Sequence, residues 1–254
     1  MTEIFPIFLW SMTALAVVVF IALQFVTAGY GMMRSPQWGP SVPNRWGWIL
    51  MESPVFLAML ALWWFSSRRV DAVPLCFFLL FQLHYFQRSF VFPFLIRGAG
   101  SMPLSIILMG VLFNVLNACM QGGWIFYIAP EGYYGASWFS DPRFLVGIAV
   151  FFFGMGINLH SDHIIRHLRK PGDRNHYLPR GGMFRYVASA NYLGELMEWT
   201  GFAILTWSAS GAVFALWTAA NLVPRAAAIH KRYGEMFGEA YRRERRKRIF
   251  PFLY

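Results

Sequence analysis

The feature that most constrains this chain is a series of long apolar stretches with almost no charge. Residues 4–33 carry no charged side chain, residues 46–67 carry only Glu52, and residues 98–130 again carry none. A helix of about 20 apolar residues crosses the hydrocarbon core of a bilayer. Charged residues make up 13% of the chain, about half of their share in soluble domains. The sequence therefore predicts a polytopic membrane protein.

We expect an all-α integral membrane protein with seven transmembrane helices, forming one membrane-embedded domain over residues 1–254. The stretch 186–224 is too long for one span, and the small polar cluster at 208–211 divides it into two. The first apolar stretch lacks a basic leader and is too long for a signal peptide, so it is predicted to be an anchor. The predicted spans are about 4–26, 46–66, 73–96, 104–128, 144–164, 186–207 and 211–229.

The charge distribution predicts how these helices are oriented. Residues 166–185 contain six basic residues and one acid, and residues 225–248 contain nine basic and three acidic residues. Basic segments stay in the cytoplasm, which places the C-terminus there and, with seven spans, the N-terminus outside. Arg68 and Arg69 argue against this arrangement, because they would lie in an external loop. The membrane is expected to be a bacterial inner membrane or the endoplasmic reticulum, and the chain a monomer.

Polar side chains inside a span are costly and mark candidate functional positions. Asn158, Asp162, Arg166 and Arg169 fall on one face of a helix that continues beyond the fifth span. They would present an amide and a carboxylate at membrane depth, and then two guanidinium groups of the kind that bind phosphates. The alternative is a simple ion pair between Asp162 and Arg166 at the end of the helix.

The sixth predicted span carries Asn191, Glu195 and Glu198 at positions i, i+4 and i+7. Two acids one turn apart repel each other unless donors lie nearby, so a ligand or the arginine face is expected to meet them. Glu195 shares its face with Asn191 and is the better candidate for a functional role. Glu198 is expected to support a neighbouring helix.

Glu52 is alone in the second span, and Tyr85 and Arg88 lie in the third. A carboxyl group beside a phenol would form a polarised pair of hydrogen-bond donors. Such a pair can hold a carbonyl oxygen and stabilise the negative charge that develops on it. The alternative for Tyr85 is an ordinary packed aromatic side chain.

Other patterns in the sequence are weaker indications of function. His160, His163 and His167 have a helical spacing that three zinc ligands can adopt, but no cysteine joins them and we expect no metal. Cys76 and Cys119 lie in apolar stretches, where cysteine is usually a small buried hydrophobe. No G-x-G-x-x-G segment follows a strand, so a soluble dinucleotide-binding fold is not expected. The glycines at 154 and 156 are expected to allow close helix packing.

Several longer segments resemble the steroid 5α-reductase family. They are GMGINLHSD at 154–162, LRKPG at 168–172, YLPRGGMF at 177–184 and ANYLGELMEW at 190–199. Shorter matches are LHYF at 83–86 followed by Arg88, the Arg-Gly pair at 97–98, the stretch 225–233 and the terminal FPF at 250–252. The resemblance covers most of the chain and is strongest between residues 154 and 199.

The resemblance implies an NADPH-dependent reduction of a 3-oxo-Δ4 steroid, with hydride added to the β-carbon of the enone and a proton to the α-carbon. Glu52 and Tyr85 match the pair that binds the 3-oxo group. By the family pattern, the residues that would line the cofactor site are Tyr30, Arg88, Asn158, Asp162, Arg166, Arg169, Tyr177, Asn191, Glu195, Arg225 and Tyr233. Met51, Phe92 and the single His230 depart from the family pattern, which leaves the steroid's identity and the role of His230 open.

Three other functions stay open at this point. A related membrane enone or polyprenal reductase would share the chemistry. An isoprenylcysteine-type membrane methyltransferase would use S-adenosylmethionine and would need fewer phosphate-binding arginines. A transporter or channel would be expected to have paired or repeated halves, and we see none. In each hypothesis of an enzyme, the apolar substrate would enter from the lipid. No nucleic-acid partner is implied.

Overall fold

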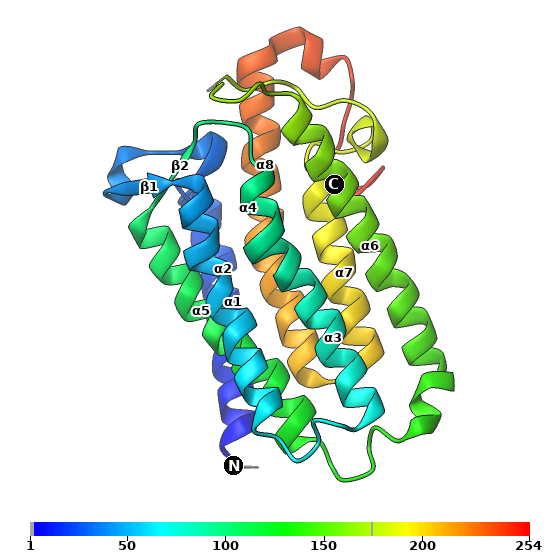
Figure 1. The fold of residues 1–254 in the computed structure, drawn as a ribbon. Coiled ribbons are helices and arrows are strands. Elements are labelled where there is room, and N and C mark those ends of the chain that lie inside the picture. The colour runs from blue at the N-terminus through cyan, green and yellow to red at the C-terminus, as the bar shows by residue number, and fades with distance from the viewer. Residues whose placement is uncertain (1–2, 174) are drawn as a thin grey trace.

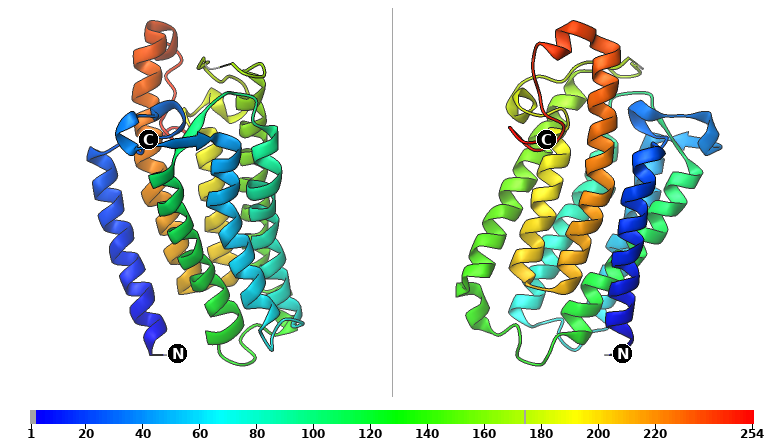
Figure 2. Two further views of the ribbon diagram at one scale, coloured as in Figure 1. Left: turned by 60° about the vertical axis from the view of Figure 1, so that its left-hand side comes forward. Right: turned by 180° about the vertical axis from the view of Figure 1, so that it is seen from behind.

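The computed structural model describes residues 3–173 and 175–254, and it is an elongated bundle of helices (Figure 1). The first helix begins at one end of the bundle, where the loop of residues 129–141 also lies (Figures 1 and 2). The long loops at 26–43 and before residue 190, together with the C-terminal segment, gather at the other end (Figures 1 and 2). The helices are α1 Ile4–Phe25, α2 Asn44–Trp64, α3 Ala72–Phe86, α4 Phe92–Leu95, α5 Leu104–Gly123, α6 Pro142–His167, α7 Ala190–Thr206 and α8 Ala209–Arg242.

In the described part of the chain, six helical segments are long and apolar enough to cross a membrane. The sixth predicted span corresponds to α7, which has 17 residues and so lies at the short end of the range of about 17–25 residues for a spanning helix. It nevertheless runs beside α6 and α8 in the bundle (Figure 1). The multi-pass architecture is confirmed, whereas the count of seven and the orientation of the termini stay predictions.

The predicted division of the stretch 186–224 is confirmed. The helix α7 ends at Thr206, and Trp207 adopts a left-handed conformation that stops it. The hydroxyl of Ser208 then caps α8 by accepting a hydrogen bond of 3.0 Å from the backbone N–H of Gly211. The helix α8 continues beyond the predicted seventh span at 211–229 and ends at Arg242, with a kink at Gly238.

Helices α6 and α7 approach each other through glycines. A β-carbon on Gly154 would lie 2.6 Å from the carbonyl oxygen of Gly194 and 2.9 Å from the α-carbon of Glu198. A β-carbon on Gly194 would collide in turn with the backbone of Asn158. Small residues allow this distance between helix backbones in a membrane. The prediction of close packing is confirmed for Gly154, whereas Gly156 faces away with nothing within 4 Å.

The third predicted span is interrupted where its charged residue lies. After α3, residues Gln87–Val91 form a π-helical turn, and α4 follows. Pro93 has no N–H to donate back into an α-helical turn, and a local widening of the helix accommodates it. Such π-turns often occur at functional sites. This one contains Arg88, whose side chain is buried inside the bundle.

Two short strands were not predicted. They are β1 Ser41–Pro43 and β2 Ser101–Pro103, which pair antiparallel at the end of the bundle where the long loops gather (Figure 1). The pairing ties the segment after α1 to the segment before α5. Below it, aromatic residues fill the core, among them the buried Phe81, Trp199 and Phe202. The loops are therefore held over one end of a rigid interior.

Candidate active site

One large cavity of about 1240 Å³ opens between the helices and extends under the loops. It collects side chains from α1, α2, α3, α5, α6, α7 and α8, which are far apart in the sequence. The predicted site residues that line it are Tyr30, Glu52, Tyr85, Arg88, Asp162, Arg166, Arg169, Asn191, Glu195, Arg225 and Tyr233. Its charged lining is mixed, with six arginines and four acids.

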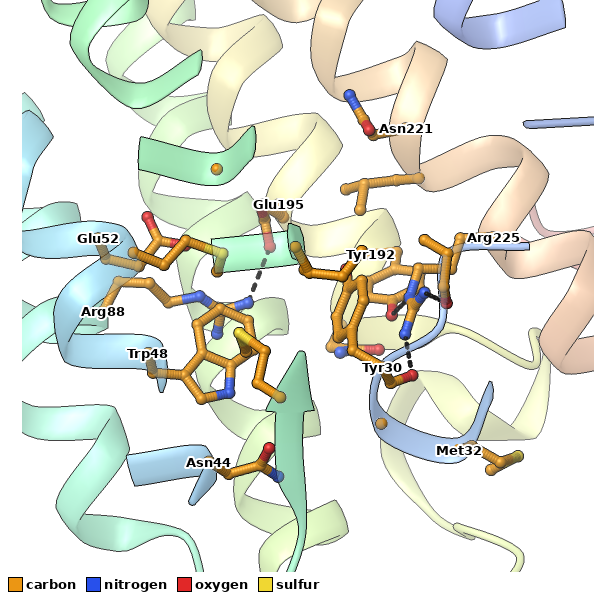
Figure 3. Close-up of a pocket in the computed structure, with 18 of the residues that line it drawn as sticks. Tyr30, Met32, Asn44, Trp48, Glu52, Arg88, Tyr192, Glu195, Asn221 and Arg225 are labelled. Carbon is orange, nitrogen blue, oxygen red and sulfur yellow. Dashed lines mark hydrogen bonds and ion pairs between the residues drawn. The ribbon is translucent and has the colours of Figure 1, made fainter. Parts of the chain in front are cut away.

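Arg88 is the centre of a buried ion-pair network. Its guanidinium donates to Asp162 Oδ2 at 3.0 Å and to Glu195 Oε2 at 3.3 Å. The indole ring of Trp48 lies against the same guanidinium, with the ring centroid 4.8 Å away (Figure 3). Removing the cation from an interior ion pair leaves an uncompensated charge, so Arg88 holds the buried Asp162 of α6 and the partly buried Glu195 of α7 in place. The alternative pairing of Asp162 with Arg166 is wrong, because Asp162 pairs with Arg88.

Glu52 and Tyr85 line the same cavity, but no hydrogen bond joins them in the described structure. The expected direct donor pair is therefore not present. Each group is held instead by an asparagine of α5. Asn114 Nδ2 donates to Glu52 Oε2 at 3.1 Å, and Asn117 Nδ2 donates to the Tyr85 hydroxyl oxygen at 3.1 Å. Glu52 and Tyr85 thus each accept one hydrogen bond from an asparagine. This leaves the Tyr85 proton and the second Glu52 oxygen available to a ligand.

Arg225 is occupied with holding a loop. It donates to the Tyr192 hydroxyl at 2.8 Å and to the backbone oxygens of Ala28 and Tyr30 at 3.1 and 2.9 Å. Its guanidinium also lies 3.6 Å from the centroid of the Tyr30 ring (Figure 3). Burial raises the pKa of Tyr30 to about 12, so its hydroxyl stays protonated at neutral pH. Arg225 therefore fixes the segment after α1 as a wall of the cavity.

The arginines at the loop end of the cavity have fewer hydrogen-bond partners than Arg88 and Arg225. Arg166 Nη1 is buried without a hydrogen-bond partner in the described structure. Arg169 lies beyond the end of α6 at His167 rather than on the helix, so the single helical face predicted from Asn158 to Arg169 is wrong at its last member. The side chain of Arg169 contacts His176. Burial and the charge of Arg169 lower the pKa of His176, which keeps this histidine neutral near pH 7.

Two predicted cofactor residues do not line the cavity. Asn158 is buried, and its amide donates to the backbone oxygen of Asn191 at 2.9 Å, which braces α6 against α7. Tyr177 is 42% exposed and donates to Asp173 Oδ2 at 2.9 Å. The helical period placed Asn158 on the correct face, but a backbone partner across the α6–α7 contact takes up its amide.

The remaining polar residues have structural partners. Glu198 pairs with His84 Nδ1 at 2.8 Å between α7 and α3, as its expected supporting role implies. His163 and His167 stack with ring centroids 3.9 Å apart, and no group of three potential metal ligands is found among the described residues. His230 accepts from or donates to the Tyr241 hydroxyl at 2.7 Å and lies outside the large cavity.

The sequence reasoning missed Asn114, Asn117, Trp48 and Tyr192. The two asparagines had a detectable signal, because amides in a charge-free span need partners. They are also three positions apart in the sequence, which puts them on one face of α5. Trp48 and Tyr192 had no such signal among 11 tryptophans and 11 tyrosines.

Comparison with known proteins gives consistent results. The family model for 3-oxo-5-alpha-steroid 4-dehydrogenase matches residues 100–254. The chain is 42% identical to 3-oxo-5-alpha-steroid 4-dehydrogenase 1 of Bos taurus, over 94% of this chain and 93% of that protein. It is 40% identical to the Homo sapiens protein of the same name, over 95% and 92%. It is also 36% identical to steroid 5-alpha-reductase DET2 of Arabidopsis thaliana, over 92% and 90%.

Proposed function

Because the chain belongs to the 3-oxo-5-alpha-steroid 4-dehydrogenase family, and is thus an oxidoreductase acting on a CH–CH bond, we propose that it uses NADPH to reduce the Δ4 bond of a 3-oxo-Δ4 steroid. The observation that carries the proposal is a single cavity with two kinds of lining. Its membrane end holds Glu52 and Tyr85 among apolar side chains, and its loop end holds arginines. A steroid enone and a phosphorylated cofactor need these two environments side by side.

The loop end of the cavity fits a dinucleotide. Arg166 offers a buried guanidinium nitrogen that has no hydrogen-bond partner among the described residues, and Arg169 lines the same cavity. Guanidinium groups bind diphosphate and 2′-phosphate oxygens in a planar fork. Asn191 and Glu195 add an amide and a carboxylate that can hold hydroxyl and amide groups deeper in the cavity. When bound, a nicotinamide cofactor would supply the hydride.

The membrane end of the cavity fits an apolar enone. Apolar side chains of α1, α5 and α8 line it, including Leu15, Leu116 and Trp217. An enone accepts hydride at its β-carbon only as negative charge moves onto its oxygen. The Tyr85 proton and a protonated Glu52 would donate hydrogen bonds to this oxygen, in a site from which the apolar walls exclude water.

The asparagines of α5 would set the direction of these two donors. Because Asn117 donates to the Tyr85 oxygen, the phenol hydrogen must point to another acceptor. Because Asn114 donates to one oxygen of Glu52, the proton of the carboxylic acid is directed to the other oxygen. Both hydrogens are then available to the same substrate carbonyl without a hydrogen bond between Glu52 and Tyr85.

The test is cofactor consumption by the purified protein in lipid, with product identification by mass spectrometry. The substrate panel contains several 3-oxo-Δ4 steroids, a polyprenal and an enoyl substrate. We expect NADPH oxidation with a steroid enone and a product two hydrogens heavier. Glu52→Gln replaces the acidic O–H donor by the much weaker N–H donor of an amide. Complete loss of one donor to a developing oxyanion costs about 10²–10³ in kcat, so this substitution is expected to lower kcat by up to about this factor with the NADPH Kd nearly unchanged.

Glu235→Gln is the matched control, since it changes an exposed acid on α8 whose ion-pair partner is Arg232. Wild-type turnover of Glu52→Gln would show that the catalytic assignment is wrong. Stabilisation of the protein by S-adenosylmethionine but not by NADPH would reject the reductase and favour the methyltransferase.

A further inference from the structure

A second cavity of about 570 Å³ lies between the loop end of α8 and the C-terminal segment. It shares no lining residue with the large cavity. Figure 2 shows the C-terminal segment folding back from the end of α8. Among the described residues, six basic side chains and no acidic one line this cavity, namely Lys231, Arg242, Arg245, Arg246, Lys247 and Arg248. The large cavity, in contrast, balances its arginines with acids.

The backbone holds these basic residues in a concave arrangement. Arg245 adopts a left-handed conformation with φ 50°, where the chain turns back after α8. The returning segment then pairs with the residues that lead into α7. Lys247 N donates to Tyr186 O at 2.8 Å, and Ala188 N donates to Lys247 O at 2.8 Å. The C-terminal segment is therefore held in place by backbone hydrogen bonds, and the cavity between it and α8 is part of the fold.

Most of the positive charge in this cavity is uncompensated. Arg242 pairs with Glu239 at 3.3 Å, and Arg246 pairs with Glu244. Among the described residues, the other four basic side chains of the cavity have no acidic partner within 4.0 Å. Arg246 is only 6% exposed, and its Nε is buried with no hydrogen-bond partner in the part of the chain that the structure describes. Like charges held this close repel one another, and a bound anion would offset that repulsion.

Membrane topology alone does not account for this arrangement. A topological signal needs basic residues on the correct side of the membrane, but it needs neither a cavity nor a buried guanidinium. Exposed apolar side chains lie beside the charges, since Phe252 is 78% and Leu253 83% exposed, and Leu253 lines the cavity. Basic and apolar side chains together are typical of a surface that contacts lipid headgroups. Clusters of four to eight basic residues next to a membrane helix attract anionic lipids.

We propose that this cavity binds the phosphate of an anionic phospholipid headgroup. Lys231 on α8 and Arg248 on the returning segment would contact the phosphate from opposite walls. An occupant would also hold the C-terminal segment against α8, and with it the backbone pairing to residues 186–189. The lipid would therefore stabilise the segment that leads into α7.

The test measures lipid binding to the full chain in detergent by native mass spectrometry. Phosphatidylglycerol is the probe, phosphatidylcholine is its comparison, and inorganic pyrophosphate represents a soluble source of the same chemistry. We expect tighter binding of phosphatidylglycerol than of phosphatidylcholine. Each basic residue contributes about 1 kcal/mol to attraction of an anionic lipid surface, so the double variant Lys231→Gln/Arg248→Gln should weaken phosphatidylglycerol binding roughly 30-fold.

The control variant Arg185→Gln/Arg243→Gln removes the same charge from exposed basic residues outside the cavity, and it should leave binding nearly unchanged. Equal binding of the two lipids, or equal losses in the two double variants, would overturn the proposal. If the protein binds pyrophosphate but does not bind phosphatidylglycerol, the claim that the phosphate belongs to a lipid is wrong. If the double variant does not fold, Lys231→Gln alone decides the test, because it alters only an exposed side chain on α8 and should still cost roughly fivefold in binding.

Discussion

Replacing Gly154 by alanine tests whether the α6–α7 contact positions the cavity. The added methyl group would lie 2.6 Å from the carbonyl oxygen of Gly194 and 2.9 Å from the α-carbon of Glu198. Both neighbours belong to the α7 backbone, so no side chain can rotate away and the helices must separate. Gly156 lies on the same helix, and no described residue would come within 4 Å of a β-carbon there. Gly156→Ala is therefore the matched control.

The magnitude follows from two opposing effects. Overpacking of a close contact costs about 1–3 kcal/mol, and alanine is favoured over glycine in a helix by about 1 kcal/mol. We expect Gly154→Ala to lower the free energy of unfolding by up to about 2 kcal/mol and Gly156→Ala to raise it by up to about 1 kcal/mol. The gain in helix propensity is common to both variants, so they should differ by the overpacking cost alone, about 1–3 kcal/mol, which is at least about a fivefold difference in the unfolding equilibrium.

The assay is unfolding of the purified protein in mixed detergent micelles, followed by tryptophan fluorescence and fitted at equilibrium. NADPH affinity is measured on the same samples. Separation of α6 from α7 would move Asp162 away from Asn191, whose amide donates to Asp162 Oδ1 at 3.3 Å, so affinity should fall only in Gly154→Ala. Equal stability and equal NADPH affinity in the two alanine variants would refute the reasoning.

Three further predictions concern single side chains. Arg169→Ala should raise the KM for NADPH by about 10–100-fold, because a hydrogen bond to a charged group contributes about 1.5–3 kcal/mol. The kcat at saturating cofactor should stay near that of the wild type, and steady-state kinetics at varied NADPH checks both values. Asn117→Ala removes the donor to the Tyr85 hydroxyl and should lower kcat about 2- to 10-fold, the equivalent of one net hydrogen bond. A wild-type kcat would contradict the positioning role. The Arg143 side chain and backbone N–H lower the pKa of Asp141 to about 2, so Asp141 stabilises the fold above its ordinary pKa near 3.8 and this contribution is lost as the pH falls through 2. Thermal melting between pH 5 and pH 2 should therefore be less pH-dependent in Asp141→Asn than in the wild type.

The sequence by itself determined the class of protein and the approximate places where helices cross. Charge is so costly in hydrocarbon that spans appear as charge-free stretches, and the end of the fourth span at residue 128 coincides with the end of the helical segment Leu104–Ile128. The same cost made Glu52, Asp162 and Glu195 stand out. Eleven of the thirteen predicted site residues line one cavity. Of these, Tyr30, Arg225 and Tyr233 were expected only from the family resemblance. The other eight are polar side chains that are expensive to bury and are kept where partners or ligands meet them.

Only the tertiary structure decided which partners these side chains have. Helical period brings Asp162 and Arg166 one turn apart, yet Asp162 pairs with Arg88 from a π-helical turn that the sequence did not reveal. The amide of Asn158 is used by the backbone of α7, and Glu52 and Tyr85 are held by two asparagines of α5. Local spacing describes one helix at a time, whereas these bonds depend on how far apart and at what angle the helices pack.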